Sequence, residues 1–528
     1  MSLYVWKAAL KRVSSSSGSR VISGAAAGAS FPSSGFPAAA AASAAATLAG
    51  PGLVQSSKIT FFIPFNSFMT EFFNKIGEAI IATADMLCEY PEFLLLIGGG
   101  LFLFIYSRAV SLRRLPQAIS VLREKQAGNS GKETGQISSV QALLSAIAAT
   151  VGMGNIAGVA VALTVGNGNP GVIFWMWVSA LVGMCTKFFE GTLAIMYKGK
   201  DSAGEVQGGP MYIITKGLGE KWKPLAVAFA IFGLVGTLCV WQANQLVESV
   251  TTVFTTPMGI ENTPWLRLIM GLVMVVIVAA VILRGIKSIA AIASKMVPLM
   301  VSLYLIMVLV IMALNYDKIP GVFSSIFEGA FTFEAGLGGF AYVALIGARR
   351  AAYVNEAGIG TASMMHGASK NTEPVREGLI AMLGPAIDSG LICTLTAIPI
   401  IIAGNYIGVG NDPKGLAIAL GAWQQLIPHV GHYLLMIIVF FFAFSTMFTY
   451  SYYGLKCTNF LFGAHNAKYY NYYYLVMIVV AAVVPLKVVV GFMDIAFFLM
   501  ACCTMTAILL LSPKVIKAER EYFKKTKR

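Results

Sequence analysis

The sequence predicts an all-α integral membrane protein with about eleven transmembrane helices: one leading helix, and a core of two five-helix repeats inserted in opposite orientations. Three observations support this prediction. The chain has 528 residues, of which 57% are hydrophobic and 12% charged, whereas soluble proteins have about 25% charged residues. Several apolar runs approach the roughly 20 residues that span a bilayer core as a helix. The pattern Asn-x-Ala-Gly occurs twice, at 155–158 and 355–358.

Residues 1–57 differ in composition from the rest of the chain. They are rich in Ala, Ser and Gly, and the first acidic residue of the whole sequence is Glu71. Basic residues with serine and no acids are typical of an organellar targeting segment, and a basic stretch before an alanine-rich run is also compatible with a secretory signal. A disordered tail, or a start codon placed too early, would have the same composition. We therefore expect a low-complexity tail or a targeting segment.

The remaining chain divides into four regions. Residues 58–137 form a leading region with an amphipathic stretch, the first span and a basic loop. Residues 138–315 form the predicted first repeat, 316–512 the second repeat, and 513–528 a basic tail. The predicted spans are 93–106, 140–163, 172–196, 224–247, 266–283, 290–314, 340–359, 379–402, 433–461, 472–485 and 493–511.

Loop charge predicts the orientation of the spans. Arg108, Arg113, Arg114 and Arg123 follow the first span, whereas acidic residues precede it. Because cytoplasmic loops carry an excess of Lys and Arg, we expect this loop in the cytoplasm. Ten further crossings return the basic C-terminal tail to the same side. The net charge of +14 is then a topology signal, and no nucleic-acid partner is expected. The seven cysteines, which form no CxxC motif, are expected to be free buried thiols.

The two Asn-x-Ala-Gly patterns interrupt the first and sixth spans of the predicted core. An offset of five spans is odd, so the second copy enters the membrane from the opposite side, as in an inverted repeat built on discontinuous helices. Glycine lets a helix open and expose its N–H and C=O groups, which is tolerated at membrane depth where they line a cavity. Freed helix N-termini attract a carboxylate, and freed carbonyls coordinate a cation. Close helix packing is the alternative use of such glycines.

Four stretches carry a resemblance to a known family. The segments 149–197, 208–212 (GGPMY) and 350–388, together with Phe444-Ser445-Thr446 and the following SYYG, resemble the alanine or glycine:cation symporters. The resemblance covers roughly residues 60–512. It implies a fold like that of the neurotransmitter:sodium symporters, with discontinuous first and sixth core helices. It also implies cotransport of a small neutral amino acid, alanine or glycine, with Na⁺ or in some members H⁺.

The resemblance also implies which residues bind substrate and ion. In this family the substrate lies between the two broken helices and neighbouring core helices. Carried onto this chain, the substrate-binding residues are Gly152, Met153, Gly154, Asn155, Gln242, Tyr353, Asn355, Gly358 and Tyr450. The Na⁺ ligands implied by the related sodium symporters are Gly152, Asn155, Ser445 and Thr446. For Ser445 and Thr446 the alternative is hydrogen bonding to the carbonyls of their own helix.

Two positions depart from the family pattern. Members commonly have Trp where this chain has Tyr450, and many have Thr where it has Met153. Methionine lacks the hydroxyl donor, so carboxylate recognition would depend more on backbone N–H groups. Tyrosine in place of tryptophan changes the volume available to the substrate. The choice among glycine, alanine and larger amino acids therefore stays open.

Charged residues within apolar segments are costly and often functional. Lys187 and Glu190 are three residues apart and can pair on one helix face. Arg349 and Arg350 precede Glu356 at the second break, and Asp388 and Asp494 lie in other apolar segments. One interpretation is a gate of ion pairs that form and break, and the other is permanent structural pairing. Glu356 is also a candidate protonation site in an H⁺-coupled variant.

Two other classes of function are alternatives to transport. A membrane-embedded enzyme needs a nucleophile–base set or a metal cluster, and a channel needs a continuous pore. The sequence contains no such catalytic set, and the paired breaks favour alternating access around one site. We therefore expect no enzymatic activity and no cofactor, with Na⁺ or H⁺ and a small amino acid as cosubstrates. The expected location is a bacterial plasma membrane with the C-terminus in the cytoplasm; residues 1–57 leave an organellar membrane open.

Overall fold

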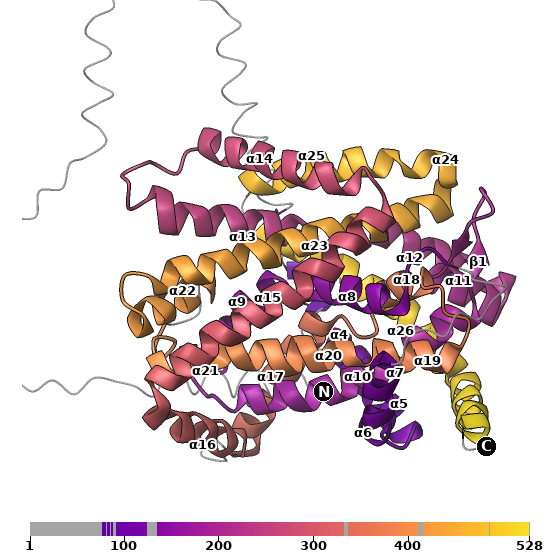
Figure 1. Ribbon diagram of the computed structural model, residues 1–528, viewed down its shortest axis with the longest axis horizontal. Helices are drawn as coiled ribbons and strands as arrows, with labels where there is room; N and C mark the ends of the chain where they lie inside the picture. The colour runs from indigo at the N-terminus through magenta and orange to yellow at the C-terminus, as the bar shows by residue number, and fades with distance from the viewer. Residues whose placement is uncertain are drawn as a thin grey trace, which may run out of the picture. The chain divides into compact units, whose positions relative to one another are not determined.

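Helices make up most of the part of the chain that the computed structural model describes (Figure 1). It describes residues 77–80, 82–84, 86–87, 91–123, 135–331, 336–409, 415–484 and 486–526. All of them belong to one compact unit, Glu71–Arg528. The expectations for residues 1–57 lie outside this described part.

The N-terminal half of the described chain ends at α15. Its helices are α4 Pro91–Phe93, α5 Gly99–Tyr106, α6 Val110–Arg113, α7 Leu115–Arg123, α8 Ser139–Thr150, α9 Met153–Val165, α10 Val172–Met196, α11 Pro210–Tyr212, α12 Lys223–Gly236, α13 Val240–Val250, α14 Pro264–Ile282 and α15 Ile286–Leu314. Two short strands, β1 Gly199–Lys200 and β2 Val206–Gln207, pair antiparallel after α10.

The C-terminal half contains the remaining helices. They are α16 Ile319–Ala330, α17 Gly336–Asn355, α18 Thr361–Gly367, α19 Pro374–Ala381, α20 Leu383–Pro385, α21 Cys393–Ala403, α22 Gly415–Leu426, α23 Gly431–Phe462, α24 Ala464–Ala467, α25 Tyr469–Val483 and α26 Leu486–Thr526. Short π-helical segments connect several of these helices, among them Ala386–Ile392 between α20 and α21.

Seven helices in the described part are long and apolar enough to cross a membrane, and the bent pair α8–α9 makes an eighth span if it is taken as one. These eight correspond to eight of the eleven predicted spans. The other three contain helices that are shorter or more polar. The leading helical segment is only Pro91–Tyr106, α25 has 15 residues, and α17 carries the adjacent Arg349 and Arg350. The protein is thus a multi-pass membrane protein.

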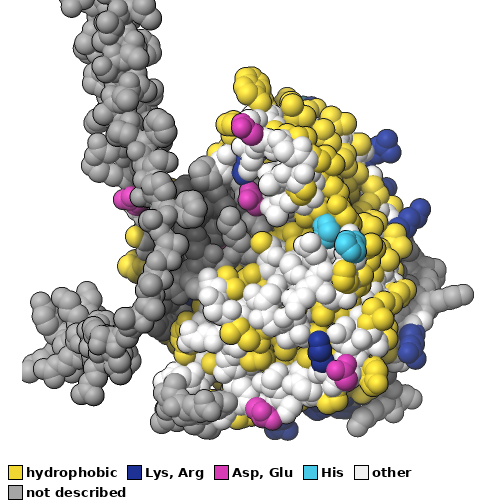
Figure 2. Space-filling model, turned by 90° about the vertical axis from the view of Figure 1, so that its left-hand side faces the viewer, with side chains coloured by type: hydrophobic (Ala, Val, Ile, Leu, Met, Phe, Trp, Pro, Cys, Tyr) yellow, Lys and Arg dark blue, Asp and Glu magenta, His cyan; other side chains and the backbone are white. Residues whose placement is uncertain are grey.

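Helix α10 connects the two halves of the described chain. It packs against α17, α18 and α19 from the C-terminal half and against α5 from the leading region. Of its apolar stretch, 72% is buried. Helices α14 and α25 pack on each other and run side by side at one edge of Figure 1. Trp265, Ile269 and Val276 of α14 are exposed, and Figure 2 shows hydrophobic side chains covering broad areas of the surface. An apolar exposed surface on a membrane protein faces lipid.

The first predicted interruption, within 140–163, lies between α8 and α9. Helix α8 begins with a capping box, in which Ser138 and Gln141 each accept a backbone N–H bond from the other. It ends at Thr150, after which Val151 and Gly152 are extended. Helix α9 then begins at Met153, bent by 46° from α8. This extended pair leaves backbone groups unused by either helix.

The second interruption lies between α17 and α18. Helix α17 ends at Asn355, and the chain then passes through three left-handed residues: Glu356 (φ 51°), Gly358 (φ 94°) and Gly360 (φ 100°). Glycine adopts this conformation without steric cost, whereas a non-glycine residue such as Glu356 rarely does. Helix α18 starts at Thr361. The turn therefore depends on interactions that hold Glu356 in place.

Candidate functional site

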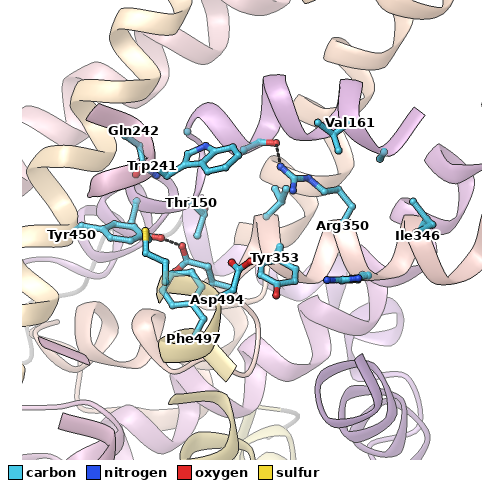
Figure 3. Close-up of a pocket in the computed structure, with 18 of the residues that line it drawn as sticks. Thr150, Val161, Trp241, Gln242, Ile346, Arg350, Tyr353, Tyr450, Asp494 and Phe497 are labelled. Carbon is cyan, nitrogen blue, oxygen red and sulfur yellow. Dashed lines mark hydrogen bonds between the residues drawn. The ribbon is translucent and has the colours of Figure 1, made fainter. Parts of the chain in front are cut away.

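A cavity of about 350 Å³ lies between the two helix breaks (Figure 3). Its wall is formed by the end of α8, by the start and the C-terminal half of α9, and by residues of α13, α17, α23 and α26. The lining residues are Ala149, Thr150, Gly152, Gly154, Val161, Ala162, Val165, Trp241, Gln242, Ile346, Arg349, Arg350, Tyr353, Val354, Glu356, Tyr450, Met493, Asp494 and Phe497. Segments distant in sequence thus converge on one space.

The N-terminus of α9 forms part of the wall. Gly152 and Gly154 line the cavity, and the Gly152 N–H donates to Asn155 Oδ1 at 3.0 Å. The first N–H groups of a helix have no partner within the helix, and the helix dipole makes this end positive. The wall therefore has an electropositive backbone region beside Gly152 that suits a carboxylate.

Glu356 supplies a carboxyl group to the opposite part of the wall. Its carboxylate accepts hydrogen bonds from the Tyr450 hydroxyl and from Thr361 Oγ1, the latter at 2.6 Å. Its carbonyl oxygen accepts from Lys187 Nζ at 3.2 Å. The residue is buried, and these contacts hold it in its left-handed conformation. A carboxyl group thus stands in the cavity wall at the second break.

Two charged side chains of α10 form hydrogen bonds with the backbone of the second break. Lys187 reaches the Glu356 carbonyl, and Glu190 Oε1 accepts the Gly358 N–H at 2.5 Å. Among the described ion pairs none joins Lys187 to Glu190, so the pairing that their spacing allows is not formed as a direct contact. The freed backbone of the break attracts both groups instead, because unpaired N–H and C=O groups at membrane depth are costly.

The two motif asparagines have a shared role. Asn155 Oδ1 accepts the Gly152 N–H, and Asn355 Oδ1 accepts the Ala357 N–H at 3.0 Å. Each amide oxygen therefore satisfies a backbone donor that its break has released. Asn155 also donates to the Asp388 carbonyl at 3.3 Å, which ties α9 to the π-helical segment.

The two motif glycines differ from each other. A Cβ at Gly158 would lie 1.5 Å from Nη2 of Arg350, so this glycine makes room for the guanidinium, which donates to the Gly154 carbonyl at 3.3 Å. Gly358 is left-handed and contacts Met505 and Leu96 closely. The glycine is therefore needed for space in the first copy, and for both conformation and space in the second.

Charged and aromatic residues line the part of the cavity farther from the first break. Arg349 lies over the Tyr353 ring at 6.0 Å, and the Tyr353 hydroxyl donates to Glu92 Oε2 at 2.5 Å. Asp494 of α26 lines the same space, near Tyr353 in Figure 3. Both predicted gate arginines therefore border the cavity, together with Glu356 and Asp494, whereas Asp388 does not line it.

The hydroxyls of α23 lie against the first break. Thr446 Oγ1 donates to the Ala148 carbonyl at 3.3 Å and to its own helix at Phe442 O, at 3.0 Å. Ser445 Oγ donates to Phe442 O at 3.1 Å. A Cβ at Gly152 would lie 2.7 Å from Thr446 Oγ1. Ser445 thus bonds to a carbonyl of its own helix, whereas Thr446 bonds both to its own helix and across to α8.

The predicted substrate residues separate into two groups. Gly152, Gly154, Gln242, Tyr353 and Tyr450 line the cavity. The residues that do not line it are Met153, Asn155, Asn355 and Gly358. Asn355 packs against α10, where a Cβ on Gly183 would lie 2.8 Å from its Nδ2.

Several lining residues were not predicted as substrate-site residues. Trp241 is adjacent to the predicted Gln242, and Thr150 precedes the first break, so both had a positional signal in the sequence. Glu356 was singled out as a member of a possible ion-pair gate and as a proton site. Met493 and Phe497 reach the cavity from α26, and nothing in their apolar sequence distinguishes them from lipid-facing residues.

A buried polar cluster closes the other side of the breaks. Glu377 Oε2 accepts from Ser139 Oγ (2.7 Å), Ser369 Oγ (3.0 Å) and Asn371 Nδ2 (3.0 Å), and Oε1 lies 2.7 Å from His366 Nδ1. We call these five residues the Glu377 cluster. They join the start of α8 to the segment that follows α18 and to α19.

Backbone contacts reinforce this cluster. Ile137 and Ser369 form a parallel bridge, in which the Lys370 N–H donates to the Ile137 carbonyl at 2.8 Å. Lys198 Nζ donates to the carbonyls of Ser369 (2.5 Å) and Asn371 (2.9 Å). Burial lowers the pKa of Lys198 to about 8, against the attraction of Glu377, which raises it.

A multi-pass helical protein whose central cavity is formed at two helix breaks has the architecture of a secondary transporter. Comparison with known proteins specifies the family: residues 73–528 match the sodium:alanine symporter family, and the chain belongs to it. This confirms the resemblance found in the sequence. Its members are symporters, so the protein is a transporter and not an enzyme.

Two relatives and one solved structure illustrate the match. The sodium/alanine symporter AgcS of Methanococcus maripaludis is 37% identical over 435 residues, covering 81% of this chain and 93% of that protein. The amino-acid carrier protein AlsT of Bacillus subtilis is 32% identical over 469 residues, covering 87% and 94%. The crystal structure of MhsT in complex with L-phenylalanine has a TM-score of 0.53 at 16% identity and covers 72% of this chain and 90% of that chain. The last likeness concerns the fold.

Proposed function

We propose that this protein imports a small neutral amino acid, alanine or glycine, together with Na⁺ by alternating access. Membership of the sodium:alanine symporter family supports the class of reaction. The observation that carries the proposal is the cavity of about 350 Å³, whose wall includes Gly152 from the first break and Glu356 from the second. A zwitterion needs one positive and one negative region, which the N-terminus of α9 and an ionised Glu356 would supply.

The substrate carboxylate would bind at the start of α9. Gly152 and Gly154 present backbone there without side chains, and a helix N-terminus attracts anions. The substrate ammonium would face Glu356. Gln242 offers a further polar contact, while Trp241 and Tyr450 restrict the volume beside the Cα substituent. This arrangement favours small side chains.

The remaining predicted substrate residues would act by shaping the breaks. Asn155 and Asn355 accept the N–H groups that the breaks release. Met153 is fully buried at the start of α9, and Gly358 allows the second turn. Their replacement is expected to disturb the positions of Gly152 and Glu356 rather than to remove a direct contact with the substrate.

Na⁺ would bind between α8 and α23, close to Gly152. Ser445 and Thr446 supply hydroxyl oxygens, and Thr446 Oγ1 already lies 3.3 Å from the Ala148 carbonyl. Carbonyls freed at a broken helix are the usual ligands of the coupling ion in such transporters. Asn155 would contribute by fixing Gly152. An ion here joins α8 to α23 beside the substrate, which couples the two binding events.

The two halves, residues 138–315 and 316–512, would form the inverted repeats. The breaks in their first helices support this, since each carries Asn-x-Ala-Gly and each asparagine accepts a freed N–H. We place the protein in a bacterial plasma membrane with the C-terminus in the cytoplasm, as the basic loop and tail indicate. The Glu377 cluster would then lie on the cytoplasmic side.

H⁺ coupling or a broader amino acid specificity is the alternative. Glu356 favours it, because a buried carboxylate in the wall of the cavity can carry the transported proton in place of the ion. The amino-acid carrier AlsT among the relatives is consistent with substrates beyond alanine.

Uptake into proteoliposomes tests these proposals. The full chain is reconstituted, and uptake of labelled alanine, glycine and glutamine is measured with an inward Na⁺ gradient, an inward H⁺ gradient, or neither. Na⁺-driven accumulation of alanine or glycine, reduced in Thr446→Val, is the expected result. Uptake driven by H⁺ alone would overturn Na⁺ coupling, and lack of gradient-driven uptake of any small amino acid would overturn the proposal.

A further inference from the structure

A second cavity, of about 340 Å³, lies where the leading helices meet the C-terminal end of α26. It shares no lining residue with the substrate cavity. Five of its residues are basic: Arg108, Arg113, Arg114, Arg520 and Lys524. Its single acidic residue is Glu519. We call it the basic cavity.

Two arginines of the basic cavity are held in place by ion pairs and stacking. Glu519, whose side chain is only 5% exposed, accepts from Arg113 Nη2 at 2.9 Å and from Arg114 Nε at 3.2 Å. The Arg114 guanidinium also stacks 3.6 Å above the Phe523 ring, and Arg113 donates to the Ser107 carbonyl at 3.2 Å. One carboxylate therefore organises two guanidinium groups, and it leaves the charge of the other cations uncompensated.

The other three cations face the cavity without such compensation. Within the described part of the chain, Arg108, Arg520 and Lys524 take part in no ion pair. Arg108 and Arg520 are exposed. Convergence of like charges in a concave site is unfavourable unless an anion joins them. Five basic side chains against one acidic side chain thus point to an anionic ligand.

The orientation of the protein in the membrane does not by itself require the five basic side chains to lie in one cavity. The excess of basic residues on the cytoplasmic side is satisfied by Lys and Arg anywhere in the loops. Here two segments separated by 406 residues, represented by Arg113 and Glu519, meet and enclose one cavity. The arrangement is that of a binding site between membrane helices.

The surroundings of the basic cavity are apolar on one side. Phe102, Ile105 and Tyr106 of α5, directly before Arg108, are 50%, 67% and 42% exposed. The rings of Phe102 and Tyr106 stack at 5.5 Å. Exposed apolar residues that end at a basic cluster match the boundary between acyl chains and headgroups. The ligand would therefore carry both a phosphate and hydrocarbon chains.

We propose that the basic cavity binds the phosphate of an anionic phospholipid headgroup, with the acyl chains lying along α5. Arginine forms charge-assisted, often bidentate hydrogen bonds with phosphate, and basic pockets between transmembrane helices are known recognition sites for anionic lipids. The bound lipid would fasten the leading helices to α26. The proposal does not depend on which substrate the protein carries.

Lipid binding to the purified full chain tests the site. Native mass spectrometry counts phosphatidylglycerol and phosphatidylcholine adducts during titration of wild type and of Arg108→Gln/Arg520→Gln. Each basic residue near an anionic lipid changes affinity roughly five-fold, so we expect the double variant to bind phosphatidylglycerol about twenty-five-fold more weakly. Arg284→Gln/Lys287→Gln is the matched control, because both residues are exposed on the same predicted side and line neither cavity.

Two further arms distinguish the ligand source and a folding defect. Arg108→Lys/Arg520→Lys keeps the charge and is expected to retain most of the binding. Glycerol 3-phosphate tests a soluble phosphate ester, and it is expected to bind far more weakly than the lipid. Equal affinity of wild type and Arg108→Gln/Arg520→Gln, equal binding of phosphatidylcholine, or equal binding of glycerol 3-phosphate would overturn the proposal.

Discussion

Single residues at the two breaks differ in what they contribute, although their sequences match. Asn155 and Asn355 each satisfy a freed backbone donor, so the physical need is common to both breaks. Gly158 and Gly358 have unrelated surroundings: one borders the Arg350 guanidinium and the other occupies a left-handed turn. The match between the motifs therefore indicates where the helices open, while the neighbouring helices determine how each opening is stabilised.

Gly158→Ala tests the space left for Arg350. The added Cβ would lie 1.5 Å from Nη2, and overpacking of this kind costs about 1–3 kcal/mol. Because Arg350 must leave the Gly154 carbonyl, we expect slower amino acid uptake and a lower thermal unfolding midpoint. Gly154→Ala is the control for stability, since its Cβ would be 3.9 Å from the same nitrogen. An unfolding midpoint as high in Gly158→Ala as in Gly154→Ala would contradict this account.

Asn355→Ala removes the acceptor of the Ala357 N–H. Leaving that buried donor unpaired costs about 1–3 kcal/mol, and it loosens the turn that presents Glu356 to the cavity. We expect uptake of alanine to be lost while the protein still elutes as a single species in size-exclusion chromatography. Asn355→Asp keeps the acceptor oxygen and should recover part of the uptake. Wild-type transport by Asn355→Ala would refute the role of this side chain.

At the scale of elements, the break positions could be predicted from the sequence and the cavity wall only in part. The Asn-x-Ala-Gly patterns locate both openings because the glycines and the released N–H groups are local features. Gln242 and Tyr450 came from the family resemblance. Met493 and Phe497 could not be predicted, because which face of α26 turns inward depends on packing across the whole bundle. The Glu377 cluster was missed because its polar members come from three separate elements.

Glu377→Ala is expected to destabilise the junction of α8, α18 and α19. It removes a buried carboxylate that accepts from Ser139, Ser369 and Asn371, and each buried donor left unpaired costs about 1–3 kcal/mol. The thermal unfolding midpoint in detergent should fall by several degrees. Glu377→Gln retains one acceptor oxygen and should fall less. Equal midpoints for wild type and Glu377→Ala would show that the cluster contributes nothing to stability.

Lys198 makes the stability of this junction depend on pH. Its pKa is about 8 in the folded protein against an ordinary value of 10.5, so between these values the unfolded chain holds a proton that the folded chain has lost. Stability contributed by Lys198 therefore rises with pH across this window and is lost as pH falls through 8. The midpoint of wild type relative to Lys198→Met should increase from pH 7.5 to pH 9.5. Lys200→Met, at an exposed site in β1, is the control, and a difference independent of pH would exclude the effect.

For the whole molecule, the cavity and the Glu377 cluster lie on opposite sides of the breaks. The cavity extends along α9 as far as Val165, whereas the cluster encloses Ser139 at the far end of α8. The substrate site is therefore closed on the side of the Glu377 cluster. If transport occurs by alternating access, the contacts between Ser139 and the segment after α18 must separate in each cycle.

A reversible cross-link tests that separation. Ser139 Oγ and Ser369 Oγ are 3.1 Å apart, so the pair Ser139→Cys and Ser369→Cys places two thiols within reach of a disulfide. Oxidation should hold the junction shut and stop uptake in proteoliposomes, and reduction should restore it, because the bond blocks only one of the two states. Each single cysteine variant, oxidised in the same way, measures the effect of losing a hydroxyl. Oxidised wild type measures the effect of oxidation on the native thiols, six of which are free in the described part of the chain. Full uptake by the oxidised double variant, with the disulfide verified by mass spectrometry, would show that this junction does not open during transport.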